Sequence, residues 1–467
     1  MAHKRKGKIE PRRPSQKSKE EPKKTKVIIA IVVVLVLVLV PLALLLSSQE
    51  PNDTPPEPEF KITFPKDEGQ HNESTEFWKV DFLLKDQVGN RVDFNIDYYL
   101  HETSPQERIV TITDPGNISG EEFFTRAHEG TLGIGYEKLD MTFDSAQGTD
   151  TWIGTYTDPY EYSYEGQVFD SGQEVYYLDL EMTSVKEPFL LGDKGIIKLE
   201  SGGNALGTIK GYMITRLDVT GSMRLSGSTY TVTGYAWMEH EWGAWTIRDM
   251  EELRLQLSTA SELFFMRFYD PQDGQIIEQL TYYSSPNGRV TELAPDEFEL
   301  SNLRYWIDPR FAPADERCLP SDWNFDSDQF FTDISFHSSI PNQIEKYHWE
   351  GSLPITGTID GVVGTGRGFA IMNHAYLSTP TIEAFYHDDS IPSDLYVNIS
   401  NGIPMDNVTA FYQVNGGSWN SVAMSVVSGD LWKVHISLFV GDDVSAYVEA
   451  YDLAGKKLTS QQEDWTV

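Results

Sequence analysis

The stretch STYTVTGYAWMEHEWG, residues 228–243, alternates polar and apolar side chains along most of its length. Alternation with a period of two is typical of a β-strand that buries one face. Similar runs rich in Tyr, Val, Thr and Phe recur along the chain, such as RVDFNIDYYL (91–100) and GYMITRLDVTGSMRL (211–225). Glycine and Asn-Gly turns separate them. The sequence therefore predicts an all-β fold from about residue 60 to the end.

The first sixty residues have a different character. Residues 1–26 hold 11 Lys/Arg and 3 Asp/Glu, and the next 20, VIIAIVVVLVLVLVPLALLL (27–46), carry no charge. A helix of this length spans roughly 30 Å, enough to cross a bilayer, and basic flanks stay in the cytoplasm. We expect a cytoplasmic tail (1–26), a transmembrane signal anchor (27–46) and a proline-rich acidic stalk (47–60). A cleaved signal peptide is the alternative, although no A-x-A site follows the apolar run.

The expected location is therefore the cell membrane, with one span and the bulk of the chain extracytoplasmic. The chain has 71 Asp/Glu against 37 Lys/Arg, a formal net charge of −34. Such a chain repels polyanions, so we expect no nucleic-acid partner.

Few motifs point to a metal or a nucleophile. Cys318 is the single cysteine, which excludes an intrachain disulfide and a cysteine-ligated metal. The acidic loop SDWNFDSDQFFTD (321–333) lacks the glycine and the final glutamate of an EF-hand loop. No G-x-S-x-G motif of a serine hydrolase is present. We expect neither a cofactor nor a metal.

Two segments suggest an internal duplication. HNESTEFWKVDFLL (71–84) and HEWGAWTIRDMEEL (240–253) each give a histidine, then Glu and Trp, then an apolar run. Two related barrels, 61–220 and 221–380, would explain the spacing. His71 and Glu76 would then occupy in the first barrel the place that GYAWMEHEWG (234–243) occupies in the second.

The composition changes near residues 378–392. Beyond this point an Asn-Gly-Gly turn at 415–417 separates two alternating runs, and further short strands recur every ten or so residues. This rhythm predicts an immunoglobulin-like β-sandwich over 381–467. Such modules more often serve as spacers or adhesion units than as catalysts.

The string G-x-A-W-M-E-x-E-W-G, together with HNESTEFW (71–78) and YHWEGSLPITGTIDGVVGTGRGF (347–369), resembles the AttH/CrtC lipocalin-like family. The resemblance covers about residues 62–378. That family includes carotenoid hydratases (hydroxyneurosporene synthases) and proteins called predicted secreted hydrolases. The resemblance implies two tandem lipocalin-like barrels and a cofactor-free site for a long apolar ligand. The family's usual EWWYF reads EFWKV at 76–80 here, which departs from the pattern.

Along the strand expected at 234–243, side chains alternate between faces. Met238, His240 and Trp242 would share one face, and Trp237, Glu239 and Glu241 the other. Adding water to an alkene requires an acid, aromatic faces to stabilise a cation, and a base. The candidate catalytic residues are Glu239, His240, Glu241, Trp242 and Asp270. The candidate ligand-binding residues are Trp237, Trp242, Trp78, Tyr269 and Glu76.

A structural role for these residues is the competing interpretation, since a tryptophan can seal a barrel end and arginines can neutralise buried carboxylates. Three functions stay open. The first is a membrane-anchored protein that binds a long hydrophobic ligand, such as an isoprenoid, carotenoid or other lipid. The second is a cofactor-free hydratase or lyase acting on an isoprenoid alkene. The third is a structural protein of the cell surface or envelope.

Overall fold

The computed structural model describes residues 61–101, 105–116, 122–156, 159–245, 249–270, 275–310, 317–345, 348–373, 377–400 and 402–467. The tail, anchor and stalk expected over 1–60 lie outside these residues. The described part is all-β, as the sequence predicts, with two short 3-10 helices, η1 (Lys66–Glu68) and η3 (Asp328–Phe330). Within it, no helix has the length and apolar character needed to span a bilayer.

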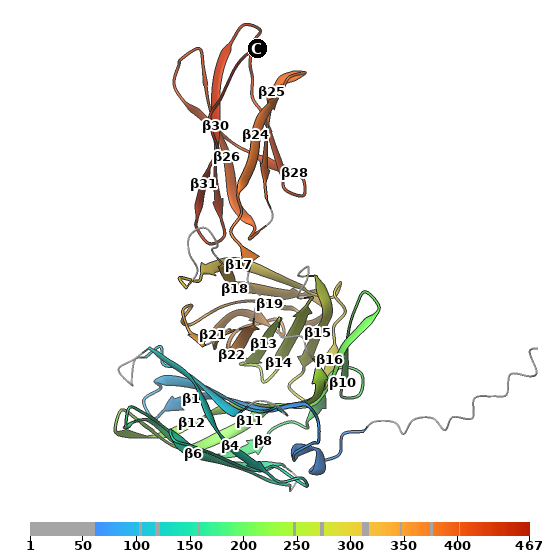
Figure 1. Ribbon diagram of the computed structural model, residues 1–467, viewed down its shortest axis with the longest axis vertical. Helices are drawn as coiled ribbons and strands as arrows, with labels where there is room; N and C mark the ends of the chain where they lie inside the picture. The colour runs from blue at the N-terminus through green and yellow to red at the C-terminus, as the bar shows by residue number, and fades with distance from the viewer. Residues whose placement is uncertain are drawn as a thin grey trace, which may run out of the picture. The chain divides into compact units, whose positions relative to one another are not determined.

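Ten antiparallel strands close into a barrel in the order β11-β12-β1-β2-β3-β4-β5-β6-β7-β8, and β8 pairs back with β11 (Figure 1). They are β1 (Thr75–Asp86), β2 (Arg91–His101), β3 (Gln106–Thr113), β4 (Phe123–Ile134), β5 (Asp140–Ser145), β6 (Gly148–Thr155), β7 (Glu161–Asp170), β8 (Gln173–Ser184), β11 (Asn204–Leu225) and β12 (Ser228–Trp245). Two short strands, β9 (Phe189–Leu190) and β10 (Ile196–Ser201), pair with the first half of β11. A register shift between Ile214 and Leu217 separates that half from the half that closes the barrel.

The interior of this barrel is filled by large side chains from strands that are not neighbours. The Tyr98 hydroxyl donates to Asp150 Oδ2 at 2.6 Å and lies 3.0 Å from the Tyr164 hydroxyl. Asp150 in turn pairs with Arg108 at 2.7 Å. Because these groups come from β2, β3, β6 and β7, their contacts cross the lumen. The family resemblance implies a site for a long apolar ligand, whereas this part of the lumen is aromatic and polar.

The second sheet is a half-barrel, which corrects the expectation of two closed barrels. Its main path runs β16-β15-β14-β13-β22-β21-β19-β18-β17, and the two end strands are not paired with each other among the described residues. Its strands are β13 (Met250–Leu257), β14 (Glu262–Tyr269), β15 (Ile276–Ser284), β16 (Val290–Glu292), β17 (Glu299–Ile307), β18 (Arg317–Ser327), β19 (Thr332–His337), β20 (Ile344–Glu345), β21 (His348–Ile359), β22 (Val362–Asn373) and β23 (Leu377–Ser378).

The reason lies in the pairing of β12. Both edges of this strand are used within the first barrel, by β1 on one side and β11 on the other. It therefore has no free edge with which to begin a second barrel. The boundary expected at residue 220 falls inside β11.

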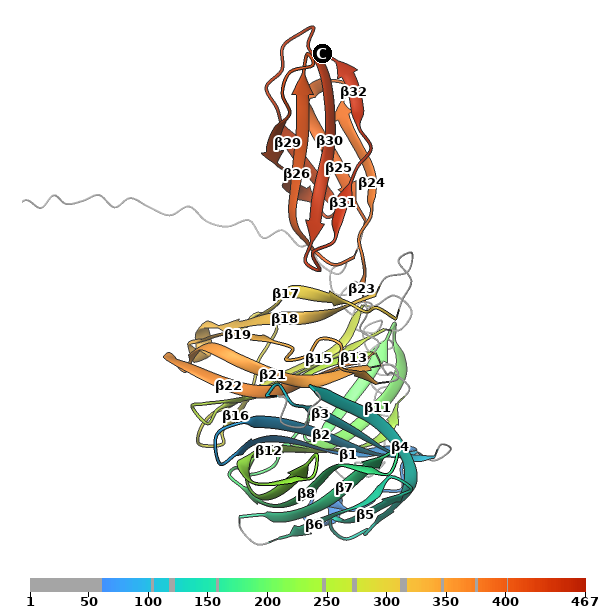
Figure 2. The same cartoon turned by 90° about the vertical axis from the view of Figure 1, so that its left-hand side faces the viewer.

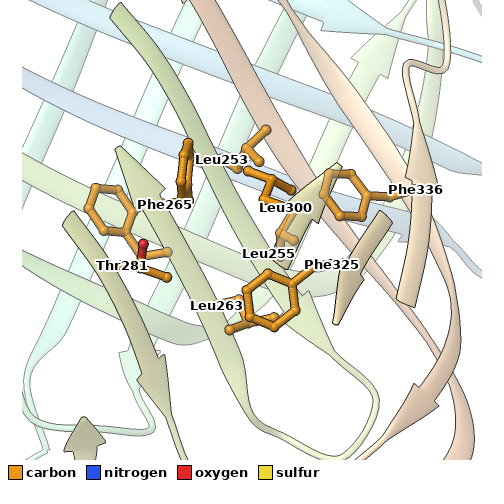
Figure 3. A pocket seen from close by; sticks show the side chains of 9 residues that line it. Leu253, Leu255, Leu263, Phe265, Thr281, Leu300, Phe325 and Phe336 are labelled. Carbon is orange, nitrogen blue, oxygen red and sulfur yellow. The ribbon is translucent and has the colours of Figure 1, made fainter. Parts of the chain in front are cut away.

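The concave side of the half-barrel holds a continuous apolar core. A small cavity in this core, of about 10 Å³, is lined by aromatic and aliphatic side chains (Figure 3). Its lining residues are Leu253, Leu255, Leu263, Phe264, Phe265, Thr281, Leu300, Phe325 and Phe336. A cavity of this size holds about one water molecule, so the core is close-packed at this point.

The C-terminal part is a β-sandwich (Figure 2). One sheet has the order β24-β25-β29-β28, and the other β27-β26-β30-β31 with β32 beside β30. The strands are β24 (Ile382–Asp388), β25 (Ile391–Ile399), β26 (Met405–Val414), β27 (Asn420–Ala423), β28 (Ser425–Ser428), β29 (Leu431–His435), β30 (Asp443–Asp452), β31 (Lys457–Thr459) and β32 (Glu463–Thr466). Buried side chains of both sheets form one core. The Asn-Gly-Gly turn joins β26 to β27, with Asn415 and Gly416 at positive φ (52° and 67°).

Candidate functional site

Strands β1 and β12 bring two halves of a site together. In their antiparallel register Glu76 lies opposite Trp242, and Trp78 lies opposite His240. Directly opposed residues point to the same side of a sheet, so these four side chains share one face. The segment that leads into β1 adds a fifth, His71, which stacks on Trp242 with ring centroids 3.9 Å apart and planes within 3°.

At the centre of the site a carboxylate is shared by two imidazoles. Glu76 Oε1 lies 2.8 Å from His71 Nδ1 and 2.9 Å from His240 Nε2. The backbone N–H of His71 donates to both Glu76 oxygens, at 3.1 and 3.0 Å. The side chains of Glu76 and His240 are fully buried, whereas that of His71 is 18% exposed. The centre therefore meets solvent on the His71 side.

Burial and hydrogen bonding act in opposite directions on these groups. Burial alone would raise the pKa of Glu76, but the hydrogen bonds from His240 and His71 outweigh it and hold that pKa below its ordinary value. Burial lowers the pKa of His240, and its contact with Glu76 offsets this only in part. Desolvation thus favours a neutral ring and the carboxylate favours a charged one.

The far side of each imidazole is held by Asp67. His240 Nδ1 lies 3.1 Å from the Asp67 carbonyl oxygen, and His71 Nε2 lies 3.3 Å from Asp67 Oδ1. The His240 ring also stacks on Trp78, with centroids 4.5 Å apart and an interplanar angle of 18°. Each imidazole is therefore placed between two oxygen acceptors and against the face of an indole.

Helix η1 fastens this segment to the barrel through Glu68. The Tyr162 hydroxyl donates to Glu68 Oε1 at 2.6 Å, and Trp78 Nε1 donates to the Glu68 carbonyl oxygen at 3.1 Å. Burial raises the pKa of Glu68 to about 7, against the opposing effect of hydrogen bonds from Tyr156 and Tyr162. The residues that precede β1 thus form a cover over the site, with a titratable carboxyl group as its buried anchor.

Comparison of the sequence with models of known protein families shows which family the chain belongs to. A family model described as AttH-like matches residues 55–376, more than half of the chain. The chain belongs to the AttH-like family. The match supports the family resemblance that the sequence motifs indicated.

Two solved structures are similar to this AttH-like chain. A crystal structure of an AttH candidate protein from Nitrosomonas europaea has a TM-score of 0.53 at 19% identity, covering 68% of this chain and 98% of that one. Kievitone hydratase from Nectria haematococca has a TM-score of 0.49 at 14% identity, covering 67% of this chain and 93% of its own. The first likeness shows the fold. No curated protein matches the chain.

In this AttH-like chain, four of the residues singled out in the sequence meet at the centre: Glu76, Trp78, His240 and Trp242. Trp237 points to the other face of β12 and packs against Phe264 of the half-barrel, with ring centroids 6.2 Å apart. The alternation of side chains therefore separates His240 and Trp242 from Trp237, Glu239 and Glu241.

Glu239 and Glu241 lie with Trp237 on that other face, in a buried charged cluster between the barrel and the half-barrel. Glu239 lies 3.4 Å from Lys79 Nζ and 3.6 Å from Arg254. Burial raises the pKa of Glu239 well above its ordinary value and that of Glu241 to about 7. The buried members of the cluster are Lys79, Asp81, Asp97, Glu239, Glu241, Glu252, Arg254 and Glu350. Their contacts join the two sheets.

Tyr269 and Asp270 make other contacts. The Tyr269 hydroxyl donates to Glu251 Oε2 at 3.1 Å, and Asp270 accepts a hydrogen bond from Ser201. Sequence reasoning also missed Asp67 and Glu68 and treated His71 and His240 as equivalent positions in two repeats. For His71 the signal was available in HNESTE (71–76), because this histidine lies just before the strand that carries Glu76 and pairs with β12.

Proposed function

We propose that this AttH-like protein is a hydratase-type enzyme that adds water to, or removes it from, a carbon–carbon double bond of an apolar molecule. The observation that supports this most strongly is the single buried carboxylate oxygen shared by two imidazoles, each of which stacks on a tryptophan. Family membership and the all-β fold are consistent with it. An isoprenoid or carotenoid alkene is the substrate class we favour.

The centre contains the groups that hydration requires. One carbon of the double bond receives a proton, the other receives the oxygen of water, and the second proton of that water returns to the protein. Imidazole and carboxylate groups at 2.8 and 2.9 Å can pass that proton along the centre. The faces of Trp78 and Trp242 would stabilise positive charge on carbon.

Substrate would reach the centre past His71, the member of the trio that keeps an exposed fraction. The cover formed by η1 and the residues after it must then move to admit a carbon chain. Its anchor Glu68 is joined to the barrel by hydrogen bonds from Tyr162 and Trp78. Such a cover, once closed, would exclude bulk water and leave only the water molecule that reacts.

The binding of a long lipid inside the half-barrel core has less support. Ligand sites for molecules of drug size occupy about 300–1,000 Å³, whereas the cavity in the half-barrel core measures about 10 Å³. The apolar segment 27–46, outside the described residues, would hold the enzyme at a membrane, where apolar substrates partition. A purely structural envelope role would not require a carboxylate shared by two histidines.

The test uses the purified full-length protein with a panel of isoprenoid alkenes and carotenoids, in water labelled with ¹⁸O and deuterium. The proposal expects a product with one ¹⁸O in a new hydroxyl group and one deuterium on the adjacent carbon, detected by mass spectrometry. If the folded protein incorporates neither label into any member of the panel, the proposal is overturned.

A further inference from the structure

We infer that His71, Glu76 and His240 form a binding site for one divalent transition-metal ion of the Zn²⁺ class. The inference concerns the same centre as the proposed function but does not depend on its activity. It is carried by the convergence of the donor atoms and by the way in which the two imidazoles are held.

Three donor atoms from separate parts of the chain converge. His71 Nδ1, Glu76 Oε1 and His240 Nε2 all lie within 4.8 Å of one another. They come from the segment before β1, from β1 and from β12. Two imidazole nitrogens and one carboxylate oxygen are a donor set that holds catalytic zinc in proteins, with a remaining position for water.

The second observation concerns the nitrogens on the far side of the rings. His240 Nδ1 faces the Asp67 carbonyl oxygen and His71 Nε2 faces Asp67 Oδ1, at 3.1 and 3.3 Å. A ring nitrogen that faces an oxygen acceptor carries the proton. Metal-ligating histidines are oriented in this way, by a carbonyl or a carboxylate on the other nitrogen.

The other two ring nitrogens, His71 Nδ1 and His240 Nε2, are the near nitrogens, and both face Glu76 Oε1. Each imidazole faces an oxygen acceptor on both nitrogens, but a neutral ring carries only one proton, so when that proton faces Asp67 the near nitrogen presents a lone pair to Glu76 Oε1. Three electron-rich atoms so close together repel one another unless positive charge lies between them. Either both rings take a second proton, or one cation replaces those two protons.

A single cation avoids a cost that two protons incur. Two imidazolium rings would stand with centroids 5.4 Å apart in a site where His240 and Glu76 are fully buried. Like charges at such a distance repel strongly in a medium of low dielectric. One divalent ion carries the same charge at one point, and Glu76 and Asp67 together balance it.

The donor set also selects the metal. Nitrogen makes up two of the three ligands, which favours Zn²⁺, Co²⁺, Ni²⁺ or Fe²⁺ over Mg²⁺ and Ca²⁺, since the latter prefer oxygen. The ion would enter between Glu76 Oε1 and the two nitrogens and replace both hydrogen bonds.

The test is a titration of the full-length protein, freed of metal with a chelator, with Zn²⁺ by calorimetry and with Co²⁺ by visible absorption. We expect one equivalent to bind, and we expect Glu76→Gln and His240→Ala to weaken binding at least 100-fold. The controls are Glu73→Gln, which removes a carboxylate three residues earlier that pairs with Lys210, and His337→Ala at an exposed site. Both controls should bind like the wild type.

Because a variant at the centre can fail to fold, the wild type supplies a second measurement. One equivalent of Zn²⁺ should raise its Tm, since a ligand of the native state stabilises it, and should do so equally in the two controls. The absence of stoichiometric binding by the folded wild type, or equal binding by the centre variants, overturns the site. Labelled product formed in the presence of chelator by a protein that binds no metal overturns the metal site and keeps the hydratase. Stoichiometric metal binding without any labelled product keeps the metal site and overturns the hydratase.

Discussion

Glu76 and His240 are 164 residues apart in sequence, and their side chains meet at 2.9 Å in the interior of the protein. The contact exists because β1 and β12 are neighbours in one closed barrel. The two segments that look like copies of each other in the sequence are therefore the two halves of a single site. Closing the barrel is what assembles the centre.

The buried cluster between the sheets should depend most on Arg254. This guanidinium donates to Asp81 at 2.6 Å and to Glu252 at 2.6 Å, and it lies 3.5 Å from Glu350. Arg254→Met leaves Asp81 and Glu350 without this cation, which costs about 3–5 kcal/mol for a buried pair. Urea denaturation should show this loss.

The matched control for Arg254 is Arg224→Met, which removes a bidentate arginine from the half-buried surface partner Glu174. Surface pairs contribute little, so its denaturation midpoint should stay near that of the wild type. Equal effects of the two substitutions would contradict a structural role for the cluster.

Glu68 should make stability depend on pH. Its pKa is raised from 4.5 to about 7 in the folded protein, so the stabilisation is complete below pH 4.5 and is lost as the pH rises through 7. The linked free energy is about 3 kcal/mol. Glu68→Gln mimics the protonated group, so its stability relative to the wild type should rise by about that amount between pH 4 and pH 8. A difference that stays constant over this range would show that Glu68 does not anchor the cover.

Tyr269 and Asp270 were candidates from sequence, but the Tyr269 hydroxyl donates to Glu251 and Asp270 accepts from Ser201. Tyr269→Phe and Asp270→Asn should therefore keep the rate of product formation within about threefold of the wild type. Steady-state kinetics on the labelled substrates measures this. A loss of about 100-fold, the usual effect of removing a general acid or base, would move the active site towards the end of β14.

Much of the local structure could be predicted because it depends on near neighbours in sequence. The period of two in 228–243 predicts a strand, and the same period separates His240 and Trp242 from Glu239 and Glu241. The Asn-Gly-Gly turn likewise specifies its own hairpin. These features need no knowledge of distant residues.

Pairing between distant strands could not be predicted in this way. The sequence of a strand does not specify which other strand it pairs with. The pairing of β12 within the first barrel was therefore missed, and with it the open second sheet. For the same reason Glu239 and Glu241 resembled a catalytic pair: their cations, Lys79 and Arg254, come from other strands. Asp67 was missed because one of its two contacts is made by a backbone carbonyl, which any residue carries.

The most direct test of the central claim is the ratio of hydration rates between Glu76→Gln and Glu73→Gln, measured on folded protein at saturating substrate. Both variants remove one carboxylate from the same short segment, but Glu76 alone is shared by the two histidines. The account predicts a rate at least 100-fold lower for Glu76→Gln, with Glu73→Gln close to the wild type. Equal rates for the two variants would contradict it and would leave the histidine–glutamate centre as a structural seam of the barrel.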